Sequence, residues 1–159
     1  MKPHLRVFSL TLTLVVGMFY SPLAPAHDDP PLAPTDPDYA QAQKAINAKD
    51  WDAAVRLLTQ AGSRDDKNPD IYNSLGYAER NRGNMESAFS YYEKALALNP
   101  KHLGAREYMG EAYLLTGNLA KAEEQLAALD KLCFFSCLEY RELKDKVTEY
   151  KQKQQAPNS

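Results

Sequence analysis

The sequence predicts an all-α protein, an α-α superhelix of stacked helical hairpins. Two observations predict this fold class. From Thr35 onward the apolar residues recur at helical spacing. The same stretch also resembles itself when it is shifted by 34 residues, which is the mark of a repeat architecture. With 44% apolar and 25% charged residues, the chain has the composition of an ordinary globular protein.

The N-terminal segment has the pattern of a signal peptide. Lys2 and Arg6 form a short basic region, residues 7–20 are apolar, and residues 24–26 have the small-residue A-x-A pattern of a cleavage site. We therefore expect residues 1–26 to be removed after Ala26. The apolar run is shorter than the ~20 residues of a spanning helix, so no stable membrane anchor is expected after cleavage. A periplasmic or secreted protein follows from this prediction.

Residues 27–34, which read HDDPPLAP, are predicted to be a proline-rich linker. From residue 27 onward the chain has 17 basic and 21 acidic residues, a net charge of −4. This acidic balance argues against nucleic acid as a partner. Residues 156–159 are expected to be a disordered tail.

One segment of the repeat region shows the pattern most clearly. Residues 69–102 predict two helices, with a turn at Gly83-Asn84 and a stop at Asn99-Pro100. The positions that characterise this unit are Leu75, Gly76, Ala88, Tyr92, Ala95 and Pro100. Small residues at such positions let two helices approach closely, and the larger Tyr92 fills the remaining space.

These residues resemble the tetratricopeptide repeat, a helix-turn-helix unit of 34 residues. A shift of one period in either direction gives matching units at 35–68 and 103–136. The resemblance therefore implies three repeats in register. Glu79 stands where the family usually has a tyrosine, which is expected to weaken that packing contact. Residues 137–155 carry a narrow apolar stripe and are predicted to form a helix that caps the open end of the solenoid.

The resemblance also implies a binding surface, because the first helix of each tetratricopeptide hairpin lines a concave groove. The residues assigned to this groove are Tyr39, Gln43, Asn73, Tyr77, Arg80, Asn81, Glu107 and Glu111. Tyrosines offer rigid amphipathic surface, asparagines can pair with a peptide backbone, and Arg80 can hold a carboxylate. Chaperone-binding relatives clamp a C-terminal carboxylate with cationic side chains at fixed positions. Those positions hold no lysine or arginine here, so an acidic C-terminal tail is not the expected ligand.

No catalytic motif accompanies the repeats. The sequence has no Gly-rich phosphate loop, no metalloprotease pattern and no nucleophile elbow, and only His27 and His102 follow the signal peptide. We therefore predict no enzyme activity, no catalytic residue, no resident metal and no cofactor. The leading hypothesis is an adaptor or scaffold that binds a protein or peptide partner. Self-association into a homo-oligomer through the exposed repeat face is a further interpretation.

Cys133 and Cys137 are the most distinctive local feature. Their spacing places the two Cα atoms ~6 Å apart in a helix, which is within reach of a disulfide in an oxidising compartment. A bridge would fix the junction between the last repeat and the capping helix. Two other readings stay open at this point. The thiols could form a reduced buried pair, or they could serve a thiol-dependent role in copper delivery or redox transfer.

Overall fold

The computed structural model describes residues 36–134 and 137–155, which form seven α-helices and no strand. The predicted signal peptide, the linker and the tail at 156–159 lie outside the described residues. Among the described helices, none combines the length and the apolar character needed to cross a membrane.

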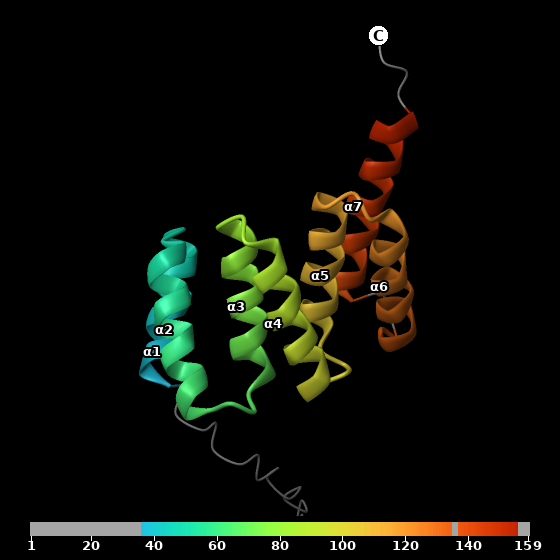
Figure 1. The fold of residues 1–159 in the computed structure, drawn as a ribbon. Coiled ribbons are helices and arrows are strands. Elements are labelled where there is room, and N and C mark those ends of the chain that lie inside the picture. The colour runs from blue at the N-terminus through green and yellow to red at the C-terminus, as the bar shows by residue number, and fades with distance from the viewer. Residues whose placement is uncertain (1–35, 135–136, 156–159) are drawn as a thin grey trace, which may run out of the picture. The chain divides into compact units, whose positions relative to one another are not determined.

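The helices follow one another side by side, from α1 to α7 (Figure 1). They are α1 (Pro37–Asn47), α2 (Trp51–Arg64), α3 (Pro69–Asn81), α4 (Met85–Leu98), α5 (Leu103–Leu115), α6 (Leu119–Leu132) and α7 (Leu138–Gln155). Each helix packs on the next in the chain, and α5 additionally contacts α3 and α7. This arrangement confirms the predicted all-α superhelix of helical hairpins.

Side-chain caps explain where several helices begin. Asp36 accepts hydrogen bonds from the backbone N–H of Asp38 at 2.8 Å and of Tyr39 at 3.2 Å, which starts α1. Arg64, at the end of α2, donates to the same Asp36 carboxylate at 2.8 Å and so fastens the two ends of the first hairpin. The imidazole of His102 caps α5 by accepting from the N–H of Ala105 at 3.1 Å. His102 therefore has a structural role.

Two glycines make the close turns inside the second and third hairpins. Gly83 has φ 88° and Gly117 has φ 77°, a left-handed conformation that costs glycine little. In the first hairpin Lys49 adopts φ 58° at the equivalent place, so a non-glycine residue takes the left-handed position there. The predicted turn at Gly83 is confirmed by this geometry.

Two glycines on first helices lie beneath large side chains. A Cβ on Gly76 would lie 2.5 Å from Cε1 of Tyr92, so the fully buried Tyr92 ring needs a glycine beneath it, as the sequence predicts. In the third hairpin, a Cβ on Gly110 would lie 2.6 Å from Cδ2 of Leu143, which belongs to α7. The capping helix thus takes the space over the last repeat.

Glu79 does not leave a weak spot between the helices. It is only 7% exposed, accepts from Asn84 Nδ2 at 2.7 Å and forms an ion pair with Arg82 at 3.2 Å. Arg82 also binds Asp52 of α2 at 2.8 Å. A polar network therefore replaces the aromatic contact that the family usually has at this place.

Helix α7 is fixed by packing and by a covalent bond. Leu143 and Val147 are buried against α5 and α6, whereas Leu138 is 56% exposed, so the buried stripe is narrower than the sequence pattern. Cys133, which ends α6, forms a disulfide with Cys137, directly before α7, with the Cα atoms 5.5 Å apart. The bridged form is therefore the one present in this structure.

Candidate peptide-binding site

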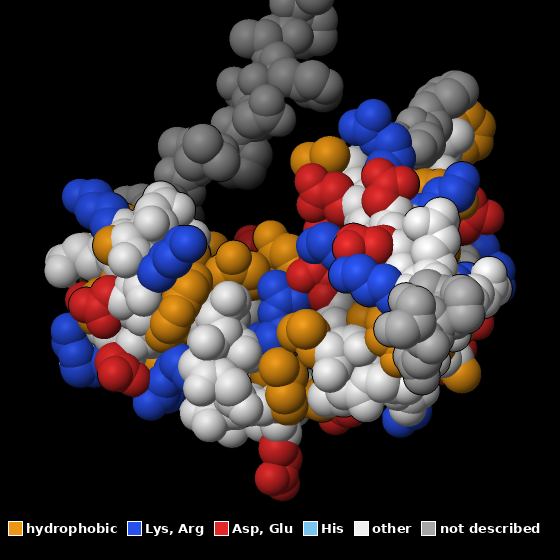
Figure 2. All heavy atoms as spheres, turned by 90° about the horizontal axis from the view of Figure 1, so that it is seen from above, with side chains coloured by type: hydrophobic (Ala, Val, Ile, Leu, Met, Phe, Trp, Pro, Cys, Tyr) orange, Lys and Arg blue, Asp and Glu red, His pale blue; other side chains and the backbone are white. Residues whose placement is uncertain are grey.

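Two hollows lie next to each other on the first helices of the hairpins. One is a hollow of about 390 Å³ between α1, α3 and α5, which we call the neutral hollow. The other has about 360 Å³ and lies between α3, α5 and α7; we call it the charged pocket. Seen from above, hydrophobic side chains gather toward the middle, and cationic and anionic side chains alternate over the half that carries α5 and α7 (Figure 2).

The neutral hollow is built from uncharged side chains. Its lining comprises Tyr39, Gln43, Ile46, Asn47, Asn73, Ser74, Tyr77 and Tyr108. Gln43 donates to Ser74 across the α1–α3 boundary at 3.2 Å. Asn73 has a buried Oδ1 atom that accepts no hydrogen bond within the described part of the chain. Such a surface suits the alternating N–H and C=O groups of a peptide backbone better than a charged ligand.

Arg80 lines the charged pocket and contacts two tyrosines of the neutral hollow. Its guanidinium lies 5.2 Å from the ring centre of Tyr77 and 5.4 Å from that of Tyr108, so it contacts an aromatic ring on each of two helices. The two rings are themselves 5.0 Å apart. Only 8% of the Arg80 side chain is exposed. This cation is therefore part of the framework that holds the aromatic side chains in place.

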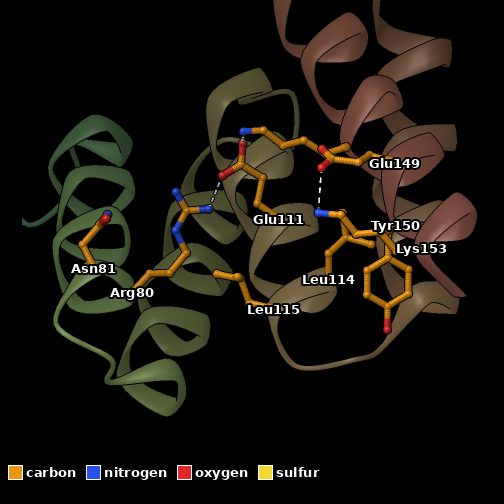
Figure 3. A pocket seen from close by; sticks show the side chains of 9 residues that line it. Arg80, Asn81, Glu111, Leu114, Leu115, Glu149, Tyr150 and Lys153 are labelled. Atoms are coloured by element: carbon orange, nitrogen blue, oxygen red, sulfur yellow. Dashed lines mark hydrogen bonds and ion pairs between the residues drawn. The ribbon is translucent and has the colours of Figure 1, made fainter. Parts of the chain in front are cut away.

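The charged pocket is organised around Glu111 (Figure 3). Its carboxylate binds Arg80 with one oxygen and Lys146 of α7 with the other. A second ion pair, Glu149 with Lys153 at 2.7 Å, lies on the α7 side. Burial lowers the pKa of Lys146, and the positive charge of Arg80 lowers it further, although Glu107 acts in the opposite direction.

Apolar side chains complete the charged pocket. Leu114 and Leu115 of α5 and Tyr150 of α7 line it together with the ion pairs. Leu115 is 67% exposed, so its side chain is accessible to a ligand in this pocket. The pocket therefore combines an accessible apolar wall with a charged rim.

Glu107 lies in neither hollow. It is 4% exposed and its carboxyl group interacts with Glu142 of α7, whereas its buried Oε1 atom has no hydrogen-bond partner within the described residues. Burial raises the pKa of Glu107 to about 8, and the hydrogen bond and charge of Glu142 add to the shift. At neutral pH the raised pKa favours the protonated, uncharged form of Glu107 at the α5–α7 contact.

Family models described as tetratricopeptide repeat match residues 39–102 and residues 80–132, so that together they span more than half of the chain. The chain belongs to the tetratricopeptide repeat family. By sequence, a 75-residue segment of this chain, 47% of its length, is 29% identical to a part of Protein O-mannosyl-transferase TMTC3 of Homo sapiens. That match spans only 8% of the human protein's length.

Solved tetratricopeptide structures share the fold at low sequence identity. The translocator chaperone SycD of Yersinia enterocolitica has 17% identity and a TM-score of 0.67, over 75% of this chain and 84% of that one. The TPR2B domain of yeast Sti1, in a complex with pHsp70, has 19% identity and a TM-score of 0.68, over 73% and 94%. The first tetratricopeptide domain of RPAP3, bound to an HSP90 peptide, has 18% identity and a TM-score of 0.65, over 75% and 91%.

The eight residues assigned to the tetratricopeptide groove fall in three places. Tyr39, Gln43, Asn73 and Tyr77 line the neutral hollow, and Arg80, Asn81 and Glu111 line the charged pocket. Glu107 is buried under α7 because that helix covers its side of α5. That these residues bind a partner remains a prediction.

Reasoning from the tetratricopeptide pattern missed the contribution of α7. Four of its side chains line the charged pocket: Lys146, Glu149, Tyr150 and Lys153. The family pattern assigns the groove to the first helices only, so it says nothing about this helix. A usable signal was the spacing of these four residues, which repeats after three, four and seven positions and so lies on one helical face.

The described residues contain no group of three or more histidine, cysteine or carboxylate side chains arranged to hold a metal ion. Cys133 and Cys137, which were candidates for soft-metal ligation, are bonded to each other. In this state neither sulfur is a thiolate that could act as a ligand or nucleophile.

Proposed function

We propose that this chain is a non-catalytic adaptor of the periplasm or another export compartment, which binds an extended peptide segment of a partner protein. The observation that carries the proposal is the adjacency of the neutral hollow and the charged pocket across α1, α3, α5 and α7. Together they offer backbone-pairing groups, apolar surface and charge along one path. An extended chain can use all three at once.

Structural neighbours support a peptide as the ligand class. SycD has been solved with a peptide of the translocator YopD, and PcrH with the chaperone binding region of PopD. The mannosyl-transferase activity named for the sequence relatives is not part of the proposal, because this chain covers only 8% of their length.

Site-specific photocrosslinking tests the proposal. A crosslinker at Ile46, which lines the neutral hollow, should trap a discrete partner in the cells that export the protein, whereas one at Ser90 on α4 should not. Changing Tyr77→Ala together with Asn73→Ala should abolish the adduct. An adduct of unchanged yield in this double variant would rule out the groove as the binding site.

Tyr77 also packs against Trp51 and Tyr108, so the double variant must be shown to be folded by circular dichroism. If it is not, Tyr39→Ala with Gln43→Ala removes other groups of the same hollow and gives a second version of the test. The compartment is tested separately, by the intact mass of the exported protein before and after reduction and alkylation. A mass that begins at His27, with alkylation only after reduction, is the expected result.

A further inference from the structure

The charged pocket has the chemistry of a site for an apolar side chain. Leu114, Leu115 and Tyr150 present hydrocarbon and ring surface to a cavity of about 360 Å³. This volume lies within the range of small ligand sites and can take a single large side chain. Because Leu115 is two-thirds exposed, filling the pocket would remove apolar surface from water and favour binding.

The rim of the same pocket carries more positive than negative charge. Its cations are Arg80, Lys146 and Lys153, and its anions are Glu111 and Glu149. Glu149 is used by Lys153, and Glu111 is shared by the other two cations. One carboxylate therefore serves two cations, which leaves the pocket short of one negative charge.

Of the two cations that share Glu111, Lys146 is the better placed to accept a further partner. Its ammonium group has three N–H donors, and Glu111 is the carboxylate it binds in the structure. The side chain is 46% exposed, whereas Arg80 is 8% exposed and enclosed by two rings. Glu107 is a further acidic group that acts on Lys146 and raises its pKa against the larger effect of burial, but at 4% exposed it is not among the residues that line the pocket.

The neutral hollow differs from the charged pocket, because all of its lining side chains are uncharged. On the proposed function, we infer that the peptide ligand places an apolar residue in the charged pocket and an aspartate or glutamate side chain, one or two residues away, on Lys146. The part of the peptide that crosses α1 and α3 then carries no charge. A carboxylate is preferred to a cation here because it supplies the negative charge that the pocket lacks.

Fluorescent peptides in solution test this inference. The probes are blocked decapeptides with an N-acetyl group, a C-terminal amide and a background of Ser, Thr and Asn. One position holds Leu or Ser, and a position one or two residues away holds Glu, Gln or Lys. Fluorescence polarisation should rank Leu with Glu above Leu with Gln by about threefold to tenfold, and Leu with Lys lowest. The blocked ends separate a side-chain carboxylate from a chain terminus, so a free-acid version that alone binds would overturn the assignment.

Three variants separate the two contributions. Lys146→Gln should abolish the preference for Glu over Gln and keep that for Leu over Ser, while Leu115→Ser should do the reverse. Lys151→Gln is the matched control, because it removes the same charge from α7 but pairs with Glu123 at 2.5 Å on α6. A Glu preference that survives Lys146→Gln, or that Lys151→Gln removes equally, would overturn the inference.

The results with these peptides distinguish a failure of this inference from a failure of the proposed function. One outcome is that peptides bind without any preference for Leu or Glu, and that Tyr77→Ala with Asn73→Ala abolishes this binding. That outcome would support the groove as the binding site and refute the ligand class. If none of the probes binds, the ligand class is refuted and the crosslinking experiment alone decides the groove.

Discussion

The ring of Tyr92 on α4 occupies the space in which a side chain on Gly76 of α3 would lie. A Cβ at residue 76 would be 2.5 Å from Cε1 of the ring, a distance that no real contact shows. Tyr92 is fully buried, so it has little room to move aside. The closeness of α3 and α4 therefore depends on this pair.

Gly76→Ala should lower the free energy of unfolding by about 1–3 kcal/mol, because the added methyl group forces the buried ring out of its position. Urea denaturation monitored by circular dichroism would measure the change. Gly62→Ala in α2 is the matched control. Its Cβ would meet Ile71 at an ordinary 3.4 Å, so the better helix propensity of alanine should raise stability by up to about 1 kcal/mol. Equal effects of both substitutions would contradict the packing argument.

Substitutions at Gly110 and Leu143 should have non-additive effects on the free energy of unfolding. Leu143→Ala alone is expected to cost about 2–5 kcal/mol, since it leaves a cavity under α7. Gly110→Ala alone should cost about 1–3 kcal/mol through overpacking. The double variant should lose less than the sum of the two, because the new methyl group enters the vacated space. Strictly additive losses in a double-mutant cycle would show that the two residues do not meet.

The buried carboxyl group of Glu107 should make stability depend on pH. The pKa of Glu107 is raised in the folded protein from 4.5 to about 8. A raised carboxyl pKa means that the folded state holds the proton more tightly, so its contribution is complete below about pH 4.5 and is lost as the pH rises through about 8. The free energy of unfolding should therefore fall by at least about 1 kcal/mol between about pH 5 and pH 9.

Glu107→Gln should flatten this decline, because an amide has nearly the same size as the carboxyl group and stays uncharged at every pH. Thermal unfolding at a series of pH values would show it, and the variant should be the more stable protein at alkaline pH. Glu149→Gln provides the control on α7, since Lys153 lowers the pKa of that exposed carboxyl and its titration lies below this range. A wild-type decline that persists in Glu107→Gln would assign the effect to another group.

The disulfide should stabilise the fold without taking part in binding. Changing Cys133→Ser together with Cys137→Ser should lower the free energy of unfolding by about 2 kcal/mol, the cost estimated for opening a short loop. Hydrogen exchange should speed up mainly in α7, and peptide binding to the neutral hollow should be kept. A variant of unchanged stability that has lost its biological activity would instead favour the thiol-dependent role.

The repeat period was enough to predict most of the fold. It placed Gly76 and Tyr92 at positions that meet, and it placed the turn at Gly83. These features recur because each hairpin inside the array packs in the same way against a neighbour on either side. At the end of the array the neighbour changes, and the side chain that lies over Gly110 is Leu143 of the capping helix.

The candidate site was less accessible to sequence reasoning for the same reason. Assigning Glu107 to the groove assumed that α5, the first helix of the third hairpin, has an open face. In the structure α7 covers that part of α5. The rotation of α7 about its own axis decides which of its residues reach the charged pocket. That rotation follows from the burial of Leu143 and Val147, and the broader apolar stripe in the sequence does not specify it.

Helix α7 carries two sets of residues with different roles. Leu143 and Val147 anchor it to the solenoid, whereas Lys146, Tyr150 and Lys153 face the charged pocket. Substitutions in the second set leave the anchor intact, so this helix is the part of the molecule where ligand preference can diverge fastest during evolution. Related chains with the same three hairpins could thus acquire different partners through changes in a single terminal helix.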